Sequence, residues 1–345
     1  MVNLQTVRAH NASLKSLGEG LVAVFVGGTS GISLSTALTL ARNTLSPRIY
    51  LIGRSQSAAD AAIANIHSIN PKAQPTFLQA DITLLKNVDK VCDQIKAREE
   101  KLNLLFMTPG TMTLKGRDET SEGLDTKFVL HYYARMRFVH QLLPLLSTAA
   151  ENDNSTLSRV VSVLDPTVSV AVGGAGKLNW DDLSLKNTFS LKNCGHHASL
   201  MNNFYLEGMA QKYPRTSFVH AYPSGVDTGI TRDVPFSKIL TPIARIVFRP
   251  FMVPLQESGE RHLFAGTSGR YPPLNVGENN LEGGDVAVGS TGKKGSGCYW
   301  VSWDGEVFPP NKKFERTRGE GAVERVIGHT EEVFKRVCEE GGTYP

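Results

Sequence analysis

The chain has 345 residues, 41% of them hydrophobic, and a formal net charge of only +4 at pH 7. A chain of this size can bury a full hydrophobic core, as one large domain or two smaller ones. Its basic residues are scattered and no Cys/His spacing resembles a zinc finger, so composition and charge argue against nucleic-acid binding.

The N-terminal stretch is polar and has no apolar core followed by a small-residue cleavage site, so no secretory signal is predicted. Arginines and prolines interrupt the apolar stretch 239–254, which therefore predicts no integral membrane segment. A cover over a pocket is a commoner role for such a stretch than a membrane-surface patch. The four cysteines lie far apart and read as free thiols. These features predict a cytoplasmic protein.

Apolar runs and helical spacings alternate along the chain. Continuous apolar runs predict buried strands at 21–26, 48–52, 76–79, 103–107, 159–164 and 217–221. Helical spacing predicts helices at 33–43, 60–70 and about 84–101, and further helices between the later strands. This alternation predicts an α/β fold with a doubly wound, mostly parallel, Rossmann-like sheet.

The first strand runs into a glycine-rich turn, VGGTSGIS, before a helix. Glycines at such a turn let the backbone approach a pyrophosphate, and the helix N-terminus supplies free N–H groups. A tight turn without a ligand is the plain alternative. Ser33 stands where the dinucleotide-binding pattern has its third glycine; its hydroxyl could bond a phosphate oxygen, and we expect it to weaken cofactor binding at most.

The second strand ends in Gly53-Arg54-Ser55, about twenty residues after the glycine turn. An acidic side chain at this point usually binds the ribose hydroxyls of NAD, whereas a guanidinium suits the 2′-phosphate of NADP. Arg54 therefore favours NADPH/NADP as the cofactor. A solvated arginine is the alternative.

The glycine turn, GRS at 53–55, ADI at 80–82 and LLFMTPG at 104–110 together resemble the short-chain dehydrogenase/reductase superfamily, over about residues 20–230. Stretches such as HYYARMRFVHQLLPLL and ERHLFAGTSGRYPP resemble fungal members associated with secondary-metabolite pathways. The resemblance implies that Asp81 contacts the adenine, that Ile32 covers the pyrophosphate and that Thr228 reaches the carboxamide or a phosphate. The predicted cofactor-binding residues are Gly27, Thr29, Ser30, Gly31, Ile32, Arg54, Asp81, Gly110, Pro223 and Thr228.

The same resemblance exposes a missing catalytic tetrad. Reductases of the superfamily use an asparagine, a serine, a tyrosine and a lysine for proton transfer and substrate binding. Alignment places His131 at the asparagine, Asp165 at the serine, Gly195 at the tyrosine and Ser199 at the lysine. The fourth-strand motif, MTPG at 107–110, also lacks the two family asparagines, so one structural hydrogen-bond hub is lost.

Other titratable side chains lie near the missing tetrad. His131, Asp165, His196 and His197 are candidate general acids and bases, because imidazole titrates near neutrality and an aspartate can fix its tautomer. The structural alternative is that the two adjacent histidines cap the following helix and that Asp165 caps a turn before Pro166. No metal site is predicted.

Residues 231–345 exceed what the minimal fold needs. No repeat or linker divides the chain, so we expect one domain, 1–345, with a dinucleotide-binding core at about 20–230 and a substrate-covering extension after it. Within the extension we expect a substrate cover (234–273), a flexible loop (275–297), a hairpin in CYWVSWDGEV that turns at Asp304-Gly305, and an amphipathic helix (320–339).

These patterns predict an NADP(H)-dependent oxidoreductase that acts on a carbonyl or alcohol of a small-molecule secondary metabolite. Because the tetrad is missing, two alternatives stay open: a non-redox acid/base enzyme for dehydration, isomerisation or cyclisation, and a catalytically silent nucleotide-binding protein. Family members are often dimers or tetramers, so the resemblance also allows a homo-oligomer.

Overall fold

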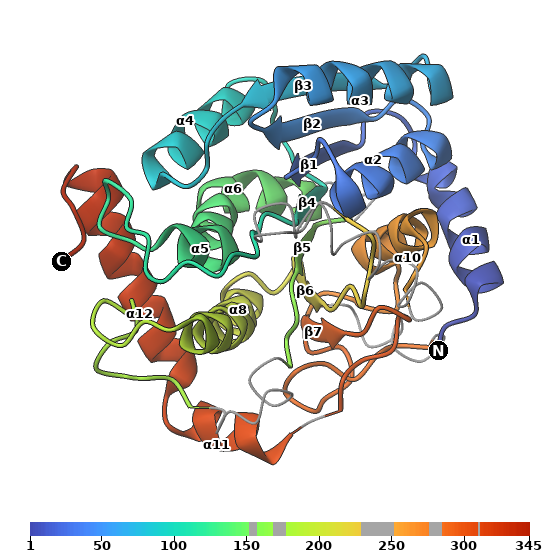
Figure 1. The fold of residues 1–345 in the computed structure, drawn as a ribbon. Coiled ribbons are helices and arrows are strands. Elements are labelled where there is room, and N and C mark those ends of the chain that lie inside the picture. The colour runs from blue at the N-terminus through green and yellow to red at the C-terminus, as the bar shows by residue number, and fades with distance from the viewer. Residues whose placement is uncertain (152–156, 168–176, 229–251, 276–284, 310) are drawn as a thin grey trace.

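A single seven-stranded parallel sheet, in the order β3-β2-β1-β4-β5-β6-β7, runs through the molecule (Figure 1). The computed structural model describes residues 1–345 apart from 152–156, 168–176, 229–251, 276–284 and 310. The strands are β1 (Val22–Val26), β2 (Arg48–Gly53), β3 (Gln74–Gln79), β4 (Leu104–Met107), β5 (Arg159–Val163), β6 (Ser217–Ala221) and β7 (Cys298–Val301).

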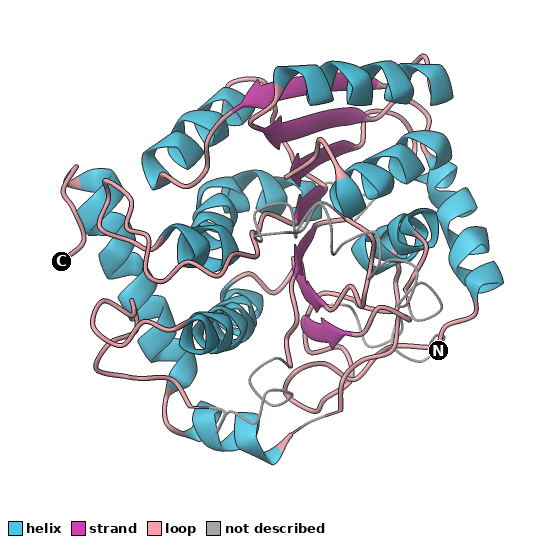
Figure 2. Cartoon of the chain, in the orientation of Figure 1, coloured by secondary structure: helices cyan, strands magenta, loops and turns pink. Residues whose placement is uncertain are grey.

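Helices cover both faces of this sheet (Figure 2). One face carries α1 (Leu4–Ser13), α2 (Gly31–Asn43), α3 (Gln56–Ile69) and α10 (Leu255–Thr267). The other face carries α4 (Leu85–Lys96), α6 (Ala134–Glu151), α8 (Leu191–Lys212) and α12 (Ala322–Phe334). The shorter elements are a 3₁₀ turn (Leu14–Leu17), α5 (Thr126–Phe128), α11 (Lys312–Gly319) and two π-helical turns (Val129–Tyr133 and Lys335–Glu339).

The fully apolar sequence of β1 follows from its central position in the sheet. Val22, Val24 and Val26 pack into the core beneath α4, α6 and α8, while Ala23 and Phe25 pack into the core beneath α2 and α10. Both sets of side chains are buried, since successive residues of a strand point to opposite faces. The predicted doubly wound parallel sheet is confirmed.

The extension joins the sheet through β7, which pairs in parallel with β6. The alternating pattern in CYWVSWDGEV predicts only a hairpin, and the turn is present: Gly305 has φ +83°, and Val301 and Val307 form an antiparallel bridge. The predicted terminal helix is confirmed as α12 with the π-helical turn that follows it.

Helix α10 lies beside α2 on the same face of the sheet, where it packs against α2 and against β4, β5 and β6 (Figure 1). The hydroxyl of Ser35 on α2 donates to the carbonyl of Leu255 at 2.9 Å. The predicted substrate cover at 234–273 therefore includes a helix that packs on α2, and its residues 234–251 lie outside the described part of the chain. Residues 276–284 of the predicted flexible loop 275–297 also lie outside it, and in the rest of that loop Val288 and Lys294 form an antiparallel bridge.

Within the described ranges, no helix is long and apolar enough to cross a membrane. All four cysteines are free thiols, as predicted, and three of them are buried: Cys92, Cys194 and Cys298.

Candidate active site

A cavity of about 510 Å³ opens at the carboxyl ends of β1, β2, β4 and β5. In doubly wound sheets, ligands bind at this edge, where neighbouring strands lead to helices on opposite faces. The described residues that line it are Gly27, Thr29, Ser30, Gly31, Ile32, Ile52, Gly53, Arg54, Ser55, Ala80, Asp81, Ile82, Thr83, Thr108, Pro109, Gly110, Leu130, His131, Arg135, Val163, Leu164, Asp165, Tyr222, Pro223 and Thr228. All ten predicted cofactor-binding residues are among them.

The glycine turn has the geometry of a phosphate cradle. Gly27 and Gly31 adopt φ values of +76° and +58°, which side-chain-bearing residues rarely adopt. A Cβ on Gly27 would lie 3.0 Å from the hydroxyl of Thr108, and one on Gly28 would lie 2.7 Å from the carbonyl of Phe25. Helix α2 begins at Gly31, and the side chain of Ser30 does not cap it, so its first N–H groups face the cavity. These residues fit a bound pyrophosphate.

Ser33 lies beneath this turn rather than at the cavity. Its side chain is fully buried, and no described residue accepts or donates a hydrogen bond to its hydroxyl. Ser33 is absent from the cavity lining, so the expected bond to a phosphate oxygen has no support from its position. The serine instead lies in the contact between helix and strand, at the position where the third glycine of the pattern allows close packing.

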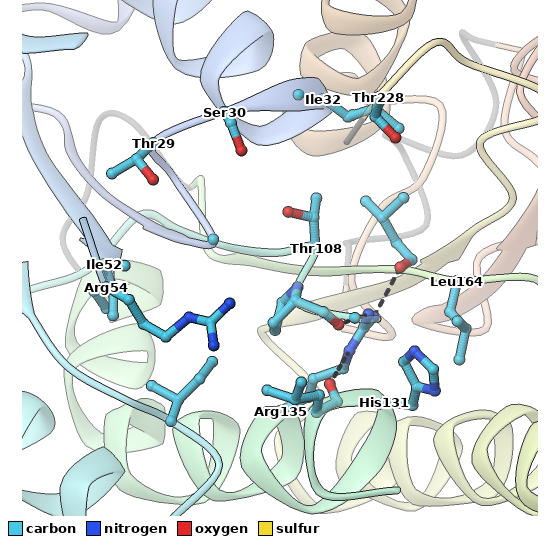
Figure 3. A pocket seen from close by; sticks show the side chains of 18 of the residues that line it. Thr29, Ser30, Ile32, Ile52, Arg54, Thr108, His131, Arg135, Leu164 and Thr228 are labelled. Carbon is cyan, nitrogen blue, oxygen red and sulfur yellow. Dashed lines mark hydrogen bonds between the residues drawn. The ribbon is translucent and has the colours of Figure 1, made fainter. Parts of the chain in front are cut away.

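Arg54 and Asp81 stand at one end of the cavity, where β2 and β3 finish. Figure 3 shows the Arg54 guanidinium pointing into the cavity, below Thr29 of the glycine turn. The Arg54 side chain forms no ion pair with any described residue. Asp81 accepts hydrogen bonds from the backbone N–H and hydroxyl of Thr83, which fixes the turn after β3. Position and charge thus suit a nucleotide's adenosine end.

His131 lies on the other side of the cavity from Arg54 (Figure 3). It sits in the π-helical turn Val129–Tyr133, a distortion common at functional sites. Burial, with the charge of Arg135, lowers the pKa of His131 to about 4, so the ring is neutral at pH 7. Its Nε2 accepts the backbone N–H of Thr111 at 3.3 Å, which leaves the proton on Nδ1. His131 is therefore a neutral hydrogen-bond donor.

Arg135 of α6 is a cavity-lining residue that the sequence did not single out. Its guanidinium donates to the carbonyls of Pro109 (2.5 Å) and Val163 (2.8 Å), which follow β4 and end β5. It also donates to the Ser162 hydroxyl at 2.8 Å and to the Leu130 carbonyl at 3.1 Å. Arg135 thus joins the ends of β4 and β5, where the family's asparagine motif is absent. The signal that could have found it is an arginine flanked by Ala134 and Met136 in a helix with many buried residues.

Asp165 lines the cavity just after β5, as predicted. Its carboxylate accepts the backbone N–H and the hydroxyl of Thr167, both at 2.7 Å, in a local turn. Its carbonyl accepts the Ser199 hydroxyl at 2.5 Å, so α8 holds this segment in place. The carboxylate of Asp165 can fix this turn and still accept a hydrogen bond from a ligand in the cavity, because it has further acceptor positions.

The structure does not bring His196 and His197 into the cavity. His197 accepts the backbone N–H of Asn179 through Nε2 at 3.1 Å, and its Nδ1 lies 3.3 Å from the Leu183 carbonyl. Both contacts hold the segment before α8. The Nε2 of His196 is buried, with no hydrogen-bond partner among the described residues. Neither ring contacts Asp165 in the described hydrogen bonds, so the predicted His/Asp pair is not formed.

Other buried polar side chains near the positions of the missing tetrad form hydrogen bonds that hold the fold together. Ser162 donates to Asn202 at 2.9 Å, and Asn202 donates to the His131 carbonyl at the same distance. The hydroxyls of Tyr132 and Tyr133 bond Thr330 and His329 of α12. These bonds fix the π-helical turn and the ends of the strands around the cavity.

Comparison with known proteins agrees with this geometry. A family model described as short chain dehydrogenase matches residues 21–162. Over 343 residues the chain is 42% identical to Oxidoreductase AN1596 of Emericella nidulans, an alignment that covers 97% of this chain and 98% of that protein. The chain belongs to the short-chain dehydrogenase/reductase family. By family it is an oxidoreductase, with a nicotinamide dinucleotide as the cofactor class.

A second fungal relative of this short-chain dehydrogenase/reductase is Oxidoreductase andH of Emericella variicolor. The two are 36% identical over 344 residues, 98% of each chain. The crystal structure of NADPH bound carbonyl reductase from chicken fatty liver superposes with a TM-score of 0.53 at 15% identity, covering 85% of this chain and 100% of that one. At this identity the similarity shows the fold alone.

Proposed function

We propose that the protein is an NADP(H)-dependent oxidoreductase that acts on a carbonyl or alcohol of a small-molecule secondary metabolite. The observation that carries the proposal is the Arg54 guanidinium, which faces the cavity at the end of β2, on the side of Thr29 in the glycine turn. A guanidinium there suits a 2′-phosphate by charge and by its paired donors. The fungal relatives support a fungal metabolite as the substrate class.

The residues of the chain would share the work as follows. Gly27, Gly31 and the N-terminus of α2 would hold the pyrophosphate, Asp81 the adenosine and Arg54 the 2′-phosphate. The bound cofactor would supply or accept a hydride. Thr228 lies 3.4 Å from a Cβ built on Gly31, so it stands beside the cradle.

His131 would polarise the substrate oxygen at the other end of the cavity. As a neutral imidazole with its proton on Nδ1, it can donate a hydrogen bond without first being charged. We place the proton exchange between His131, the carboxylate of Asp165 and solvent, in place of the missing tyrosine. We assign no catalytic role to His196 or His197, and we place the protein in the cytoplasm.

A non-redox acid/base enzyme on the same fold is the second candidate. It is favoured by the tetrad positions themselves: Gly195 lacks a side chain although a Cβ there would meet no atom within 4 Å, and the Ser199 hydroxyl is used by the Asp165 carbonyl. There is therefore room for a Cβ atom at this position. The absence of the tyrosine fits a chemistry that does not need a phenol.

The two candidates differ in whether product formation consumes NADPH. Carbonyl compounds extracted from a fungal host that carries the gene would be incubated with the protein, with and without NADPH, and followed at 340 nm and by mass spectrometry. A reductase oxidises one NADPH per product molecule. Product that forms at an equal rate without nucleotide would instead establish the non-redox enzyme.

A further inference from the structure

Arg135 places a positive charge in the wall of the cavity, and no described carboxylate pairs with it. Only 1% of the residue is exposed, yet it forms part of the cavity wall beside His131 (Figure 3). No described acidic side chain forms an ion pair with it, Asp165 included. Burial lowers its pKa to about 9, so it stays charged at neutral pH. A buried charge of this kind is costly unless an opposite charge joins it.

Four of the five N–H groups of Arg135 donate to uncharged acceptors. These are the carbonyls of Leu130, Pro109 and Val163 and the hydroxyl of Ser162. One N–H on Nη2 has no acceptor among the described residues. The bonds orient the guanidinium, but none of them neutralises it.

Arg159 shows what a purely structural buried arginine looks like in this fold. It also donates to carbonyls, but two of these, at Ala265 and Ser268, lie at the C-terminal end of α10. The negative end of a helix dipole offsets the charge of an arginine placed there. Arg159 is absent from the cavity lining. The carbonyls around Arg135 belong to strand ends and a π-helical turn, so they give no such compensation.

A second donor, His131, lies close to Arg135 in the cavity lining (Figure 3). His131 presents Nδ1–H as a neutral donor, and the charge of Arg135 helps to keep it neutral. A cation and a neutral donor at one end of a cavity form a site for an anionic oxygen.

We propose that Arg135 and His131 form an oxyanion-binding site, and that the substrates carry a delocalised oxyanion, a carboxylate or an ionised enol, next to the reacting carbon. This inference deepens the proposed function, on which it rests for the reaction itself. Hydride transfer to a carbonyl carbon places negative charge on that carbon's own oxygen, which is then protonated, and a cation bound to the neighbouring oxyanion would lie close enough to stabilise that charge. The site would thereby take over the electrostatic part of the missing tyrosine and lysine.

The test measures binding alone and needs no nucleotide. It uses the Arg54→Gln protein, which removes the other described guanidinium of the cavity lining. Calorimetric titrations compare benzoate with benzamide, and dimedone, an acidic 1,3-diketone, with neutral cyclohexanone. We expect at least one anion to bind tenfold or more tightly than its neutral partner. Benzoate preference points to carboxylate substrates and dimedone preference to enols. Equal affinities within both pairs would overturn the proposal.

Variants at Arg135 locate the effect. In the Arg54→Gln background, Arg135→Gln should abolish the preference for the anion and Arg135→Lys should keep part of it. A preference that survives Arg135→Gln in a folded protein, checked by circular dichroism, would overturn the assignment. Arg135 joins β4 to β5, so Arg135→Gln could fail to fold. In that case His131→Ala serves instead, and it should weaken binding of the anion at least threefold. Failure of NADPH to bind wild type would contradict the proposed function and leave this result intact.

Discussion

Gly110 and His131 are in direct contact: a Cβ built on Gly110 would lie 2.9 Å from Nε2 of His131. That nitrogen also accepts the Thr111 N–H, so the ring is held between the backbone after β4 and the π-helical turn. The position of the proposed donor therefore depends on a residue with no side chain.

Gly110→Ala should displace the imidazole and reduce kcat on the carbonyl substrate by roughly 100-fold, the cost of misplacing a reacting group by about 1 Å. Thermal unfolding should change little. Gly116→Ala is the matched control, because a Cβ there meets no atom within 4 Å. Full activity in Gly110→Ala would show that His131 does not touch the substrate.

Arg54→Ala should weaken the binding of NADPH by roughly 10- to 100-fold and the binding of NADH by less than twofold, because charge-assisted bonds to the 2′-phosphate are lost. Arg42→Ala removes an exposed charge of α2 outside the cavity lining and should leave both affinities unchanged. Fluorescence titration of the wild type and both variants with each nucleotide gives the dissociation constants. Equal losses for both nucleotides would show that Arg54 does not contact the phosphate.

Ser33→Ala should raise the free energy of unfolding by about 1 kcal/mol, because it removes a buried hydroxyl that has no described partner. NADPH affinity should stay within twofold. Ser162→Ala is the contrasting variant. The Ser162 hydroxyl is equally buried but is bonded to Arg135 and Asn202, so its removal should lower the free energy of unfolding. Urea unfolding measures both. Weaker NADPH binding in Ser33→Ala would mean that the hydroxyl reaches the ligand.

His197 should make the protein sensitive to acid. Burial lowers its folded-state pKa from 6.5 to about 4, so the unfolded chain binds more protons between these values. The unfolding free energy therefore falls as the pH drops from about 6.5 to about 4, by up to about 3 kcal/mol for this residue. His197→Gln should lower the free energy of unfolding at pH 7 and make that free energy depend less steeply on pH. His67 is exposed, so His67→Gln should change neither the free energy nor its dependence on pH. An unchanged slope would contradict the neutral, structural assignment.

The sequence was sufficient for the sheet because buried parallel strands are almost entirely apolar. The run in β1 and the turn after it also predicted where the cavity lies, since a helix N-terminus after such a strand can form only at that edge. The pairing of β7 with β6 was not predicted. The alternation around it indicates a hairpin, and a parallel partner leaves no local pattern.

Side-chain direction limited the prediction of the site. On α8, Ser199 faces Asp165, and His197 is two residues earlier, about 200° around the helix. Proximity in sequence therefore did not bring His197 to the cavity. Arg135 was missed because the sequence does not distinguish it from Arg137 on the same helix, and only the tertiary structure shows which carbonyls surround it.

The central claim is that this cavity still binds NADPH although the tetrad is missing. The most direct measurement is an equilibrium titration of the wild-type protein with NADPH and with NADH, followed by tryptophan quenching and energy transfer to the nicotinamide. We expect saturable binding of NADPH, at least tenfold tighter than binding of NADH. Absence of binding by either nucleotide would contradict the claim and leave the glycine turn as the remnant of a cofactor site.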